Sequence, residues 1–216
     1  MHNLQVSNTR LRVLVKFVHK LFNSKKKFVG ILGGTFDPPH NGHIFISKFA
    51  KVKLDLGEIW WVVTPSNPLK KTKSDYKKRL LNVKRFLKSK DIKVFEVEDK
   101  KNHIYTIDLI EILYKKYPDK KFVWLMGVDN LKEFHLWKNW REIFCNIPIA
   151  IFDRPFYSLD IARTKAISYF KGYKINNRLS KELKFMKAPS WVFISGLTNL
   201  QSSTKIRSKK IVRKKN

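Results

Sequence analysis

The chain has 216 residues, of which 43% are hydrophobic and 13% aromatic, with 8 glycines and 8 prolines. This length suits one sizeable core, and the composition excludes a disordered or fibrous protein. A single cysteine, Cys145, excludes an internal disulfide, and no apolar run approaches the ~20 residues that cross a bilayer. We therefore expect one globular domain with a cytoplasmic location.

The formal net charge is +29, from 46 lysines and arginines against 17 acidic residues. Such a charge attracts polyanions and raises the hypothesis of a nucleic-acid-binding protein. Lysine supplies 36 of the 46, however, and is scattered along the chain, whereas recognition of phosphates and bases usually gathers arginines or aromatics on one face. We expect no dedicated nucleic-acid partner.

Residues 1–27 form a basic extension ahead of the domain, which we expect to span residues 28–216. Positions 8–22 place apolar residues on one helical face and could form a basic amphipathic helix. Contact with a membrane surface is conceivable, but such helices more often pack on their own protein or remain a frayed leader. The extension lacks the apolar core and cleavage site of a secretory signal.

From Phe28 onward, short apolar runs alternate with amphipathic stretches. This alternation predicts an α/β fold: a doubly wound, Rossmann-like parallel sheet with helices on both faces and a C-terminal helix. Strands are expected at 28–32, 58–64, 92–97, 122–126, 148–152 and 191–194. Helices are expected at 42–53, 76–89, 106–117, 140–146 and 159–170. Residues 171–189 are expected to be an exposed connection, and ligands should bind at the carboxyl ends of the strands.

The segment GGTFDPPHNGH, residues 33–43, lies between the first strand and the first helix. Its glycines let backbone N–H groups approach a ligand, and the helix start attracts anions. His40 and His43 are spaced so that both can donate to one phosphoryl group. This suits attack of one phosphate oxygen on another phosphorus, without a covalent nucleophile. The alternative is a turn with one capping and one solvent-facing histidine; a zinc site lacks a third ligand.

The same segment resembles the glycine-rich and His-x-Gly-His signature of the nucleotidyltransferase superfamily. Four further segments, in the expected order, resemble bacterial nicotinate-nucleotide adenylyltransferases: WWVVTP at 60–65, MGVDNL at 126–131, WKNWREI at 137–143 and SSTKIR at 202–207. The resemblance covers about residues 28–208. It implies transfer of AMP from ATP to nicotinate mononucleotide, giving nicotinate adenine dinucleotide and pyrophosphate in NAD biosynthesis.

The resemblance also implies how ATP is held. His40 and His43 would be the catalytic donors at the α-phosphate. The nucleotide pocket would be lined by Gly33, Gly34, Thr35 and Phe36. The outgoing phosphates would be bound by Ser203, Thr204, Arg207 and Lys70, although Lys70 could equally be a solvated lysine. Gly127 and Asp129 would contact the adenosine, unless Asp129 merely caps a helix. Mg²⁺ would be held through substrate phosphates, with no dedicated metal ligands in the protein.

For the second substrate, the resemblance implies that the Trp140 indole stacks on the pyridine ring, next to Arg141, while Tyr105 and Thr106 receive the carboxylate. Core packing of Trp140 and helix capping by Thr106 are the competing interpretations. Gln201, where the family usually has an apolar residue, and the basic extension depart from the pattern. Rival functions are the same transfer to nicotinamide mononucleotide or another acceptor, a cytidylyl transfer, or a nonenzymatic nucleic-acid or membrane-surface protein. The oligomeric state is not predicted.

Overall fold

The computed structural model describes residues 24, 27–64, 74–97, 104–153 and 163–196. The predicted helix at 8–22, the first residues of the helix expected at 159–170, the C-terminal helix, and the phosphate ligands Lys70, Ser203, Thr204 and Arg207 lie outside these residues. Among the described helices, none is long and apolar enough to cross a membrane.

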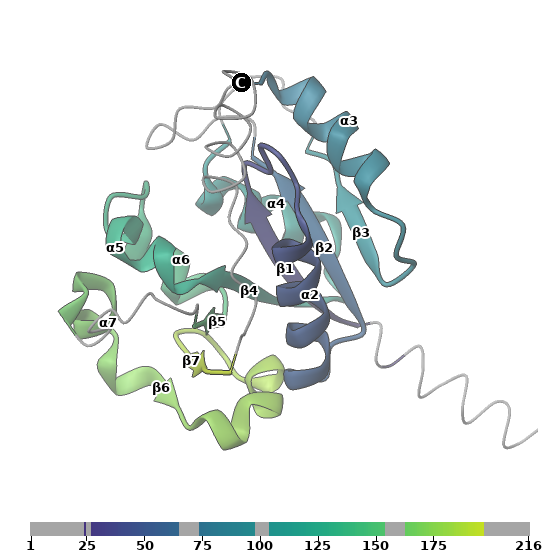
Figure 1. The fold of residues 1–216 in the computed structure, drawn as a ribbon. Helices are drawn as coiled ribbons and strands as arrows, with labels where there is room; N and C mark the ends of the chain where they lie inside the picture. Colours follow the sequence, from purple (N-terminus) through teal and green to yellow (C-terminus); the bar gives the residue numbers. More distant parts are fainter. Residues whose placement is uncertain (1–23, 25–26, 65–73, 98–103, 154–162, 197–216) are drawn as a thin grey trace, which may run out of the picture.

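The centre of the molecule is a parallel sheet of seven strands in the order β3-β2-β1-β4-β5-β7-β6 (Figure 1). The strands are β1 (Phe28–Gly34), β2 (Glu58–Val63), β3 (Ile92–Phe95), β4 (Lys121–Gly127), β5 (Ile149–Phe152), β6 (Lys174–Ile175) and β7 (Trp191–Ile194). Strand order reverses between β1 and β4, which pair directly. The doubly wound fold is therefore confirmed, and this reversal is where such sheets bind ligands.

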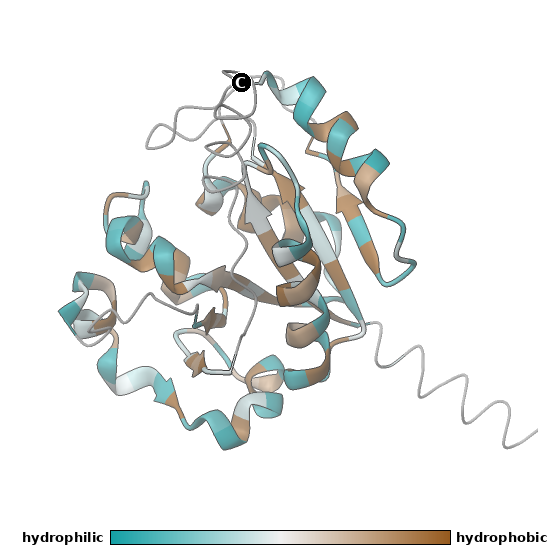
Figure 2. Cartoon of the chain, in the orientation of Figure 1, coloured by the Kyte–Doolittle hydropathy of each residue, from teal (hydrophilic) through white to brown (hydrophobic). Residues whose placement is uncertain are grey.

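Helices cover both faces of the sheet. They are α2 (Asn41–Lys53), α3 (Tyr76–Phe86), α4 (Thr106–Lys116), α5 (Leu131–Phe134), α6 (Trp140–Asn146) and α7 (Lys165–Tyr169), with short 3-10 helices η1 (Val128–Asn130), η3 (Lys171–Tyr173) and η4 (Asn177–Phe185). One apolar cluster takes residues from α2, α3 and η4, and the other from α4 to α7. Helix α3 accordingly alternates between teal and brown segments along its length (Figure 2).

Strand β2 shows why this sheet is buried on both faces. All six of its residues are buried, which is the pattern expected where helices cover both sides. Trp60 and Val62 join the cluster under α4, whereas Ile59 and Trp61 join the cluster under α2. Because successive side chains of a strand point to opposite faces, one continuous apolar run serves both cores.

Most of residues 171–189 are exposed, as expected, but the segment is more than a connection. Strand β6 pairs with β7, and η4 packs against the end of α2. Buried Lys184 donates from Nζ to the Asp55 carboxylate at 2.7 Å and to the Asp55 carbonyl at 2.9 Å. The Ser180 hydroxyl donates to the Lys53 carbonyl at 3.1 Å. Among the many lysines of this segment, Lys184 is therefore a buried and hydrogen-bonded one. At the other elements, the described bounds differ from the predicted ones by a few residues.

Candidate active site

The loop that leaves β1 is held against the end of β2. The backbone N–H and hydroxyl of Thr64 donate to the Gly34 carbonyl at 2.9 and 3.3 Å. At Gly33, a β-carbon would lie 2.6 and 2.8 Å from two ring carbons of Trp124. Glycine at this position therefore permits a close approach between the backbone and a buried indole.

Phe36 occupies the middle of this loop in a strained backbone conformation. Its φ is 46°, in the left-handed region, and its side chain is only 1% exposed. The ring stacks on Trp61, with centroids 4.8 Å apart and planes at 16°, and lies 4.7 Å from the ring of His43. A non-glycine residue keeps such a conformation only where its surroundings fix it, and this packing helps to fix it.

The two histidines lie together at the start of α2. His40 is the N-cap residue, and its buried ring is 3.7 Å from the ring of His43, between centroids. The His40 backbone N–H donates to Nδ1 of His43 at 3.2 Å, and the His43 N–H donates to the His40 carbonyl at 2.9 Å. Because Nδ1 of His43 accepts, the neutral ring carries its proton on Nε2. That nitrogen can donate to a ligand at the positive end of a 13-residue helix.

A buried hydrogen-bond chain connects this helix start to β2. The Trp61 indole N–H donates to the Ser47 hydroxyl at 2.8 Å, and this hydroxyl donates to the His43 carbonyl at 2.7 Å. Both side chains are 0% exposed. Trp61, which the sequence singled out only as part of a motif, thus helps to fix the backbone of His43.

Arg79 is a residue of this region that sequence reasoning missed. Its buried guanidinium donates from Nη1 to the carbonyls of Thr35 and Thr64 at 2.8 and 2.9 Å, and from Nε to the Ser74 carbonyl at 3.2 Å. Burial lowers the pKa of Arg79, and the charge of Asp37 opposes that shift. The sequence does hold one indication that Arg79 is buried: it lies on the apolar face of α3, at helical spacing from Val83.

Gly127 and Asp129 lie at the same edge of the sheet. Gly127 is the last residue of β4, and Asp129 follows it in η1. Strands β1 and β4 are parallel, with Leu32 opposite Leu125, so Gly34 and Gly127 end neighbouring strands on one side. The structure therefore brings the candidate adenosine contacts to the same edge as the glycine-rich loop.

The candidate pyridine residues lie at the starts of α4 and α6, two helices that contact each other. Tyr105 is the N-cap residue of α4, Thr106 begins that helix, and the Lys138 ammonium lies 4.4 Å from the Tyr105 ring centroid. This contact joins the start of α4 to the turn before α6. Trp137, in that same turn, is half-buried and packs on Phe134 with ring centroids 4.9 Å apart.

Trp140 and Arg141 also contact α7. The Trp140 side chain is 8% exposed, and its ring meets those of Tyr169 and Phe170 edge-on, at centroid distances of 5.7 and 6.1 Å. The Arg141 guanidinium lies 4.9 Å from the Trp140 ring and 5.0 Å from the Tyr169 ring. This burial favours the core-packing interpretation of Trp140, while Trp137 is the more exposed of the two residues.

Comparison with known proteins agrees with this geometry. A family model described as cytidylyltransferase-like matches residues 31–209. The chain is 37% identical over 182 residues to a probable nicotinate-nucleotide adenylyltransferase of Ruegeria sp. (strain TM1040), covering 84% of this chain and 96% of that protein. A protein of the same description from Brucella suis biovar 1 (strain 1330) is 38% identical over 181 residues, covering 83% and 93%.

A solved structure shares the fold. Plasmodium falciparum nicotinic acid mononucleotide adenylyltransferase complexed with NaAD superposes with a TM-score of 0.61 at 19% identity, covering 84% of this chain and 83% of that one. At this level of identity the likeness concerns the architecture, and it matches the parallel sheet described above.

Proposed function

The chain belongs to the cytidylyltransferase-like family and, within it, to the nicotinate-nucleotide adenylyltransferases, and on that premise we propose that it transfers AMP from ATP to nicotinate mononucleotide. The products are nicotinate adenine dinucleotide and pyrophosphate. The observation that carries the proposal is the pairing of His40 and His43 at the start of α2, directly after the glycine turn of β1. This is the place in a doubly wound sheet where phosphate groups bind.

In the proposed reaction, a phosphate oxygen of nicotinate mononucleotide attacks the α-phosphorus of ATP in line. A new P–O bond forms there, while the bond to the bridging oxygen of the β-phosphate breaks and pyrophosphate leaves with the electron pair. Negative charge develops on the α-phosphoryl oxygens. His43 Nε2–H, the neighbouring His40 and the unpaired N–H groups of α2 supply preorganised positive potential at that point.

The remaining phosphate contacts are part of the same proposal. Ser203, Thr204, Arg207 and Lys70 would hold the β- and γ-phosphates, and Gly127 and Asp129 would contact the adenosine. Nucleotidyltransferases generally use a divalent metal, and we propose Mg²⁺ carried in by the phosphate oxygens of ATP. Within the described part of the chain, no group of three or more His, Cys, Asp or Glu side chains is placed to hold a metal ion. In this proposal, phosphate oxygens and water are the main ligands of the ion.

Two features favour nicotinate over nicotinamide as the acceptor. The start of α4, at Tyr105 and Thr106, is the positive end of a helix, and the Lys138 ammonium lies against the Tyr105 ring. A carboxylate gains from both, whereas a neutral amide does not. A cytoplasmic location and a domain boundary at residue 27 remain predictions.

The test is pyrophosphate release from ATP, measured with nicotinate mononucleotide, nicotinamide mononucleotide, phosphopantetheine or no acceptor. We expect release to require an acceptor and kcat/KM to be at least about tenfold higher for the acid than for the amide, as for one added charge-assisted contact. Release that is equal for all acceptors would contradict the proposed substrate. Absence of release together with salt-dependent RNA binding would favour the nonenzymatic alternative instead.

A further inference from the structure

The guanidinium of Arg79 is a buried charge that joins three separate segments. It is 1% exposed and binds the carbonyls of Thr35 after β1, Thr64 after β2, and Ser74 before α3. Burying a cation is costly unless its donors are satisfied, and here main-chain carbonyls of three segments accept from the guanidinium. The carbonyl groups that Arg79 binds therefore indicate which parts of the site it holds in place.

One of the three carbonyls bound by Arg79, that of Thr35, is connected to the histidine pair through packed side chains. The Thr35 carbonyl belongs to the peptide that precedes Phe36, the residue with a φ of 46°. The Phe36 ring lies 4.7 Å from the His43 ring and stacks on Trp61, which in turn is tied through Ser47 to the His43 carbonyl. A shift of the Thr35 carbonyl would therefore move a ring that packs against His43.

We propose that Arg79 is a positioning residue for adenylyl transfer: by clamping the Thr35 carbonyl to the end of β2, it holds Phe36 against His43 and so aims the His43 imidazole at the α-phosphate. The inference rests on the proposed function. Lysine cannot reproduce this role, because one ammonium cannot reach carbonyls of three segments in the planar geometry of a guanidinium. A purely structural role, anchoring α3 to the sheet, predicts lost stability without a specific loss of turnover.

Arg79→Lys and Arg79→Gln are compared with Lys184→Met as a matched control. Lys184 is also a buried cation that binds a backbone carbonyl, but it joins η4 to Asp55, ahead of β2 and away from the histidines. We expect kcat of Arg79→Lys to fall about tenfold or more, with KM for nicotinate mononucleotide changed less than about twofold. Lys184→Met, measured below its own Tm, should keep kcat within about twofold while also lowering Tm. Equal kcat values in Arg79→Lys and Lys184→Met would overturn the inference.

The double variant His43→Ala with Arg79→Lys separates positioning from general damage. If Arg79 acts through His43, the double variant is no slower than His43→Ala alone. If the fold-losses in kcat of the two single variants multiply in the double variant, the two residues act independently and the inference is overturned. Should Arg79→Lys fail to fold, Phe36→Leu interrupts the same connection and carries the identical expectation.

A second readout does not depend on turnover. The proton resonances of the His43 ring in the wild-type chain should shift in Arg79→Lys and stay in place in Lys184→Met. An unmoved His43 resonance in Arg79→Lys would overturn the inference. A wild-type chain without pyrophosphate release would defeat the proposed function, while the resonance would still decide whether Arg79 positions the ring.

Discussion

The backbone N–H of His40 donates a hydrogen bond to Nδ1 of His43 at 3.2 Å, while the two imidazole rings lie 3.7 Å apart between centroids. The bond fixes both the tautomer and the orientation of the His43 ring, leaving Nε2–H as its ligand donor. We expect His43→Ala to lower kcat by about 10² or more, because a preorganised donor to the transition state is lost. Pyrophosphate release under saturating substrates measures this.

Thermal unfolding of the same variant provides the control. Tm of His43→Ala should stay within a few degrees of the wild-type value, and His135→Ala, at the end of α5, should leave turnover unchanged. Near-normal turnover in His43→Ala would remove that residue from the reaction.

The two tryptophans of the WKNW segment are expected to behave differently. Trp140 is 8% exposed and packed on α7, so Trp140→Ala should lower the free energy of unfolding by about 3 to 5 kcal/mol. Trp137 is half-buried beside Lys138, so Trp137→Ala should mainly raise KM for nicotinate mononucleotide, by about 5- to 150-fold if stacking contributes 1 to 3 kcal/mol.

Trp137→Phe keeps an aromatic plane and should restore most of the affinity for the mononucleotide. The measurements are urea unfolding for stability and KM for each substrate, with KM for ATP as the internal reference. A large rise in KM for nicotinate mononucleotide in Trp140→Leu, with Trp137→Ala unaffected, would return the stacking role to Trp140.

The parts of this molecule that the sequence predicts well are those whose signal is local. Five buried residues of β2, at 59–63, form one apolar run, and residues 33–43 carry the glycine turn and both histidines in a single segment. Connectivity alone therefore brings His40 to His43. The strand alternation then determines the sheet, because parallel strands require crossovers of one hand.

What the sequence does not predict depends on main-chain partners or on packing between distant segments. Arg79 binds carbonyl groups, which every residue possesses, so no residue type marks its partners. Lys184 lies among other lysines, and nothing in the sequence marks it as buried. Only its contact with Asp55 in the folded chain distinguishes it. Trp137 and Trp140 are both aromatic residues near one helix, and their different burial follows from where α7 lies.

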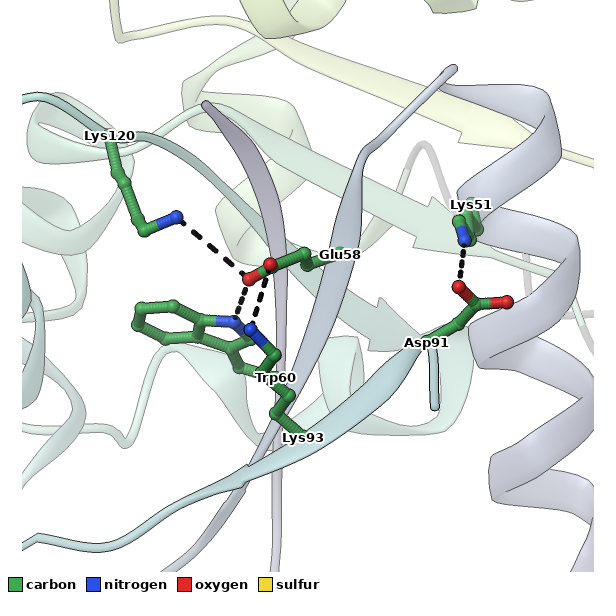
Figure 3. Close-up of polar contacts among 6 residues, drawn as sticks. All are labelled: Lys51, Glu58, Trp60, Asp91, Lys93 and Lys120. Atoms are coloured by element: carbon green, nitrogen blue, oxygen red, sulfur yellow. Dashed lines mark hydrogen bonds and ion pairs between the residues drawn. The ribbon is translucent and has the colours of Figure 1, made fainter. Parts of the chain in front are cut away.

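Glu58 gives the stability of the fold a pH dependence. Its carboxylate accepts hydrogen bonds from Lys93 Nζ at 2.8 Å and the Trp60 indole N–H at 2.9 Å, with Lys120 Nζ at 3.9 Å (Figure 3). Burial alone would raise the pKa of Glu58, but these hydrogen bonds and the charges of Lys120 and Lys93 outweigh it, so the pKa is lowered. The ionised form is therefore favoured by folding.

The sign of the effect follows from that direction. The contribution of Glu58 is complete above the pKa of an unfolded glutamate, about 4.3, and is lost as pH falls through the lower folded pKa. Glu58→Gln should lower the free energy of unfolding by about 1 to 2 kcal/mol at neutral pH. This difference between the wild-type chain and the variant, the gap in stability, should narrow as pH falls. Urea unfolding across this range measures it. Glu96→Gln, at an exposed pair with Lys84, should have little effect, and a constant gap for Glu58→Gln would refute the assignment.

A substitution at Gly33 tests whether the fold requires the close approach of the glycine loop to Trp124. An added β-carbon would lie 2.6 Å from an indole ring carbon, and Trp124, only 1% exposed, has little room to move. We expect Gly33→Ala to lower the free energy of unfolding by about 1 to 3 kcal/mol and to reduce turnover, because the loop before the histidines must shift. The control is Gly172→Ala in η3, where an added β-carbon meets nothing within 4 Å.

A compensating change makes the steric cause specific. The carbons that would clash belong to the distal part of the indole, so Trp124→Phe removes bulk at the point of contact. If the contact is responsible, Gly33→Ala should cost less in a Trp124→Phe background than in the wild-type chain, and the difference is the coupling between the two positions. Equal costs in the two backgrounds would mean that Gly33 is needed for some reason other than the indole beneath it.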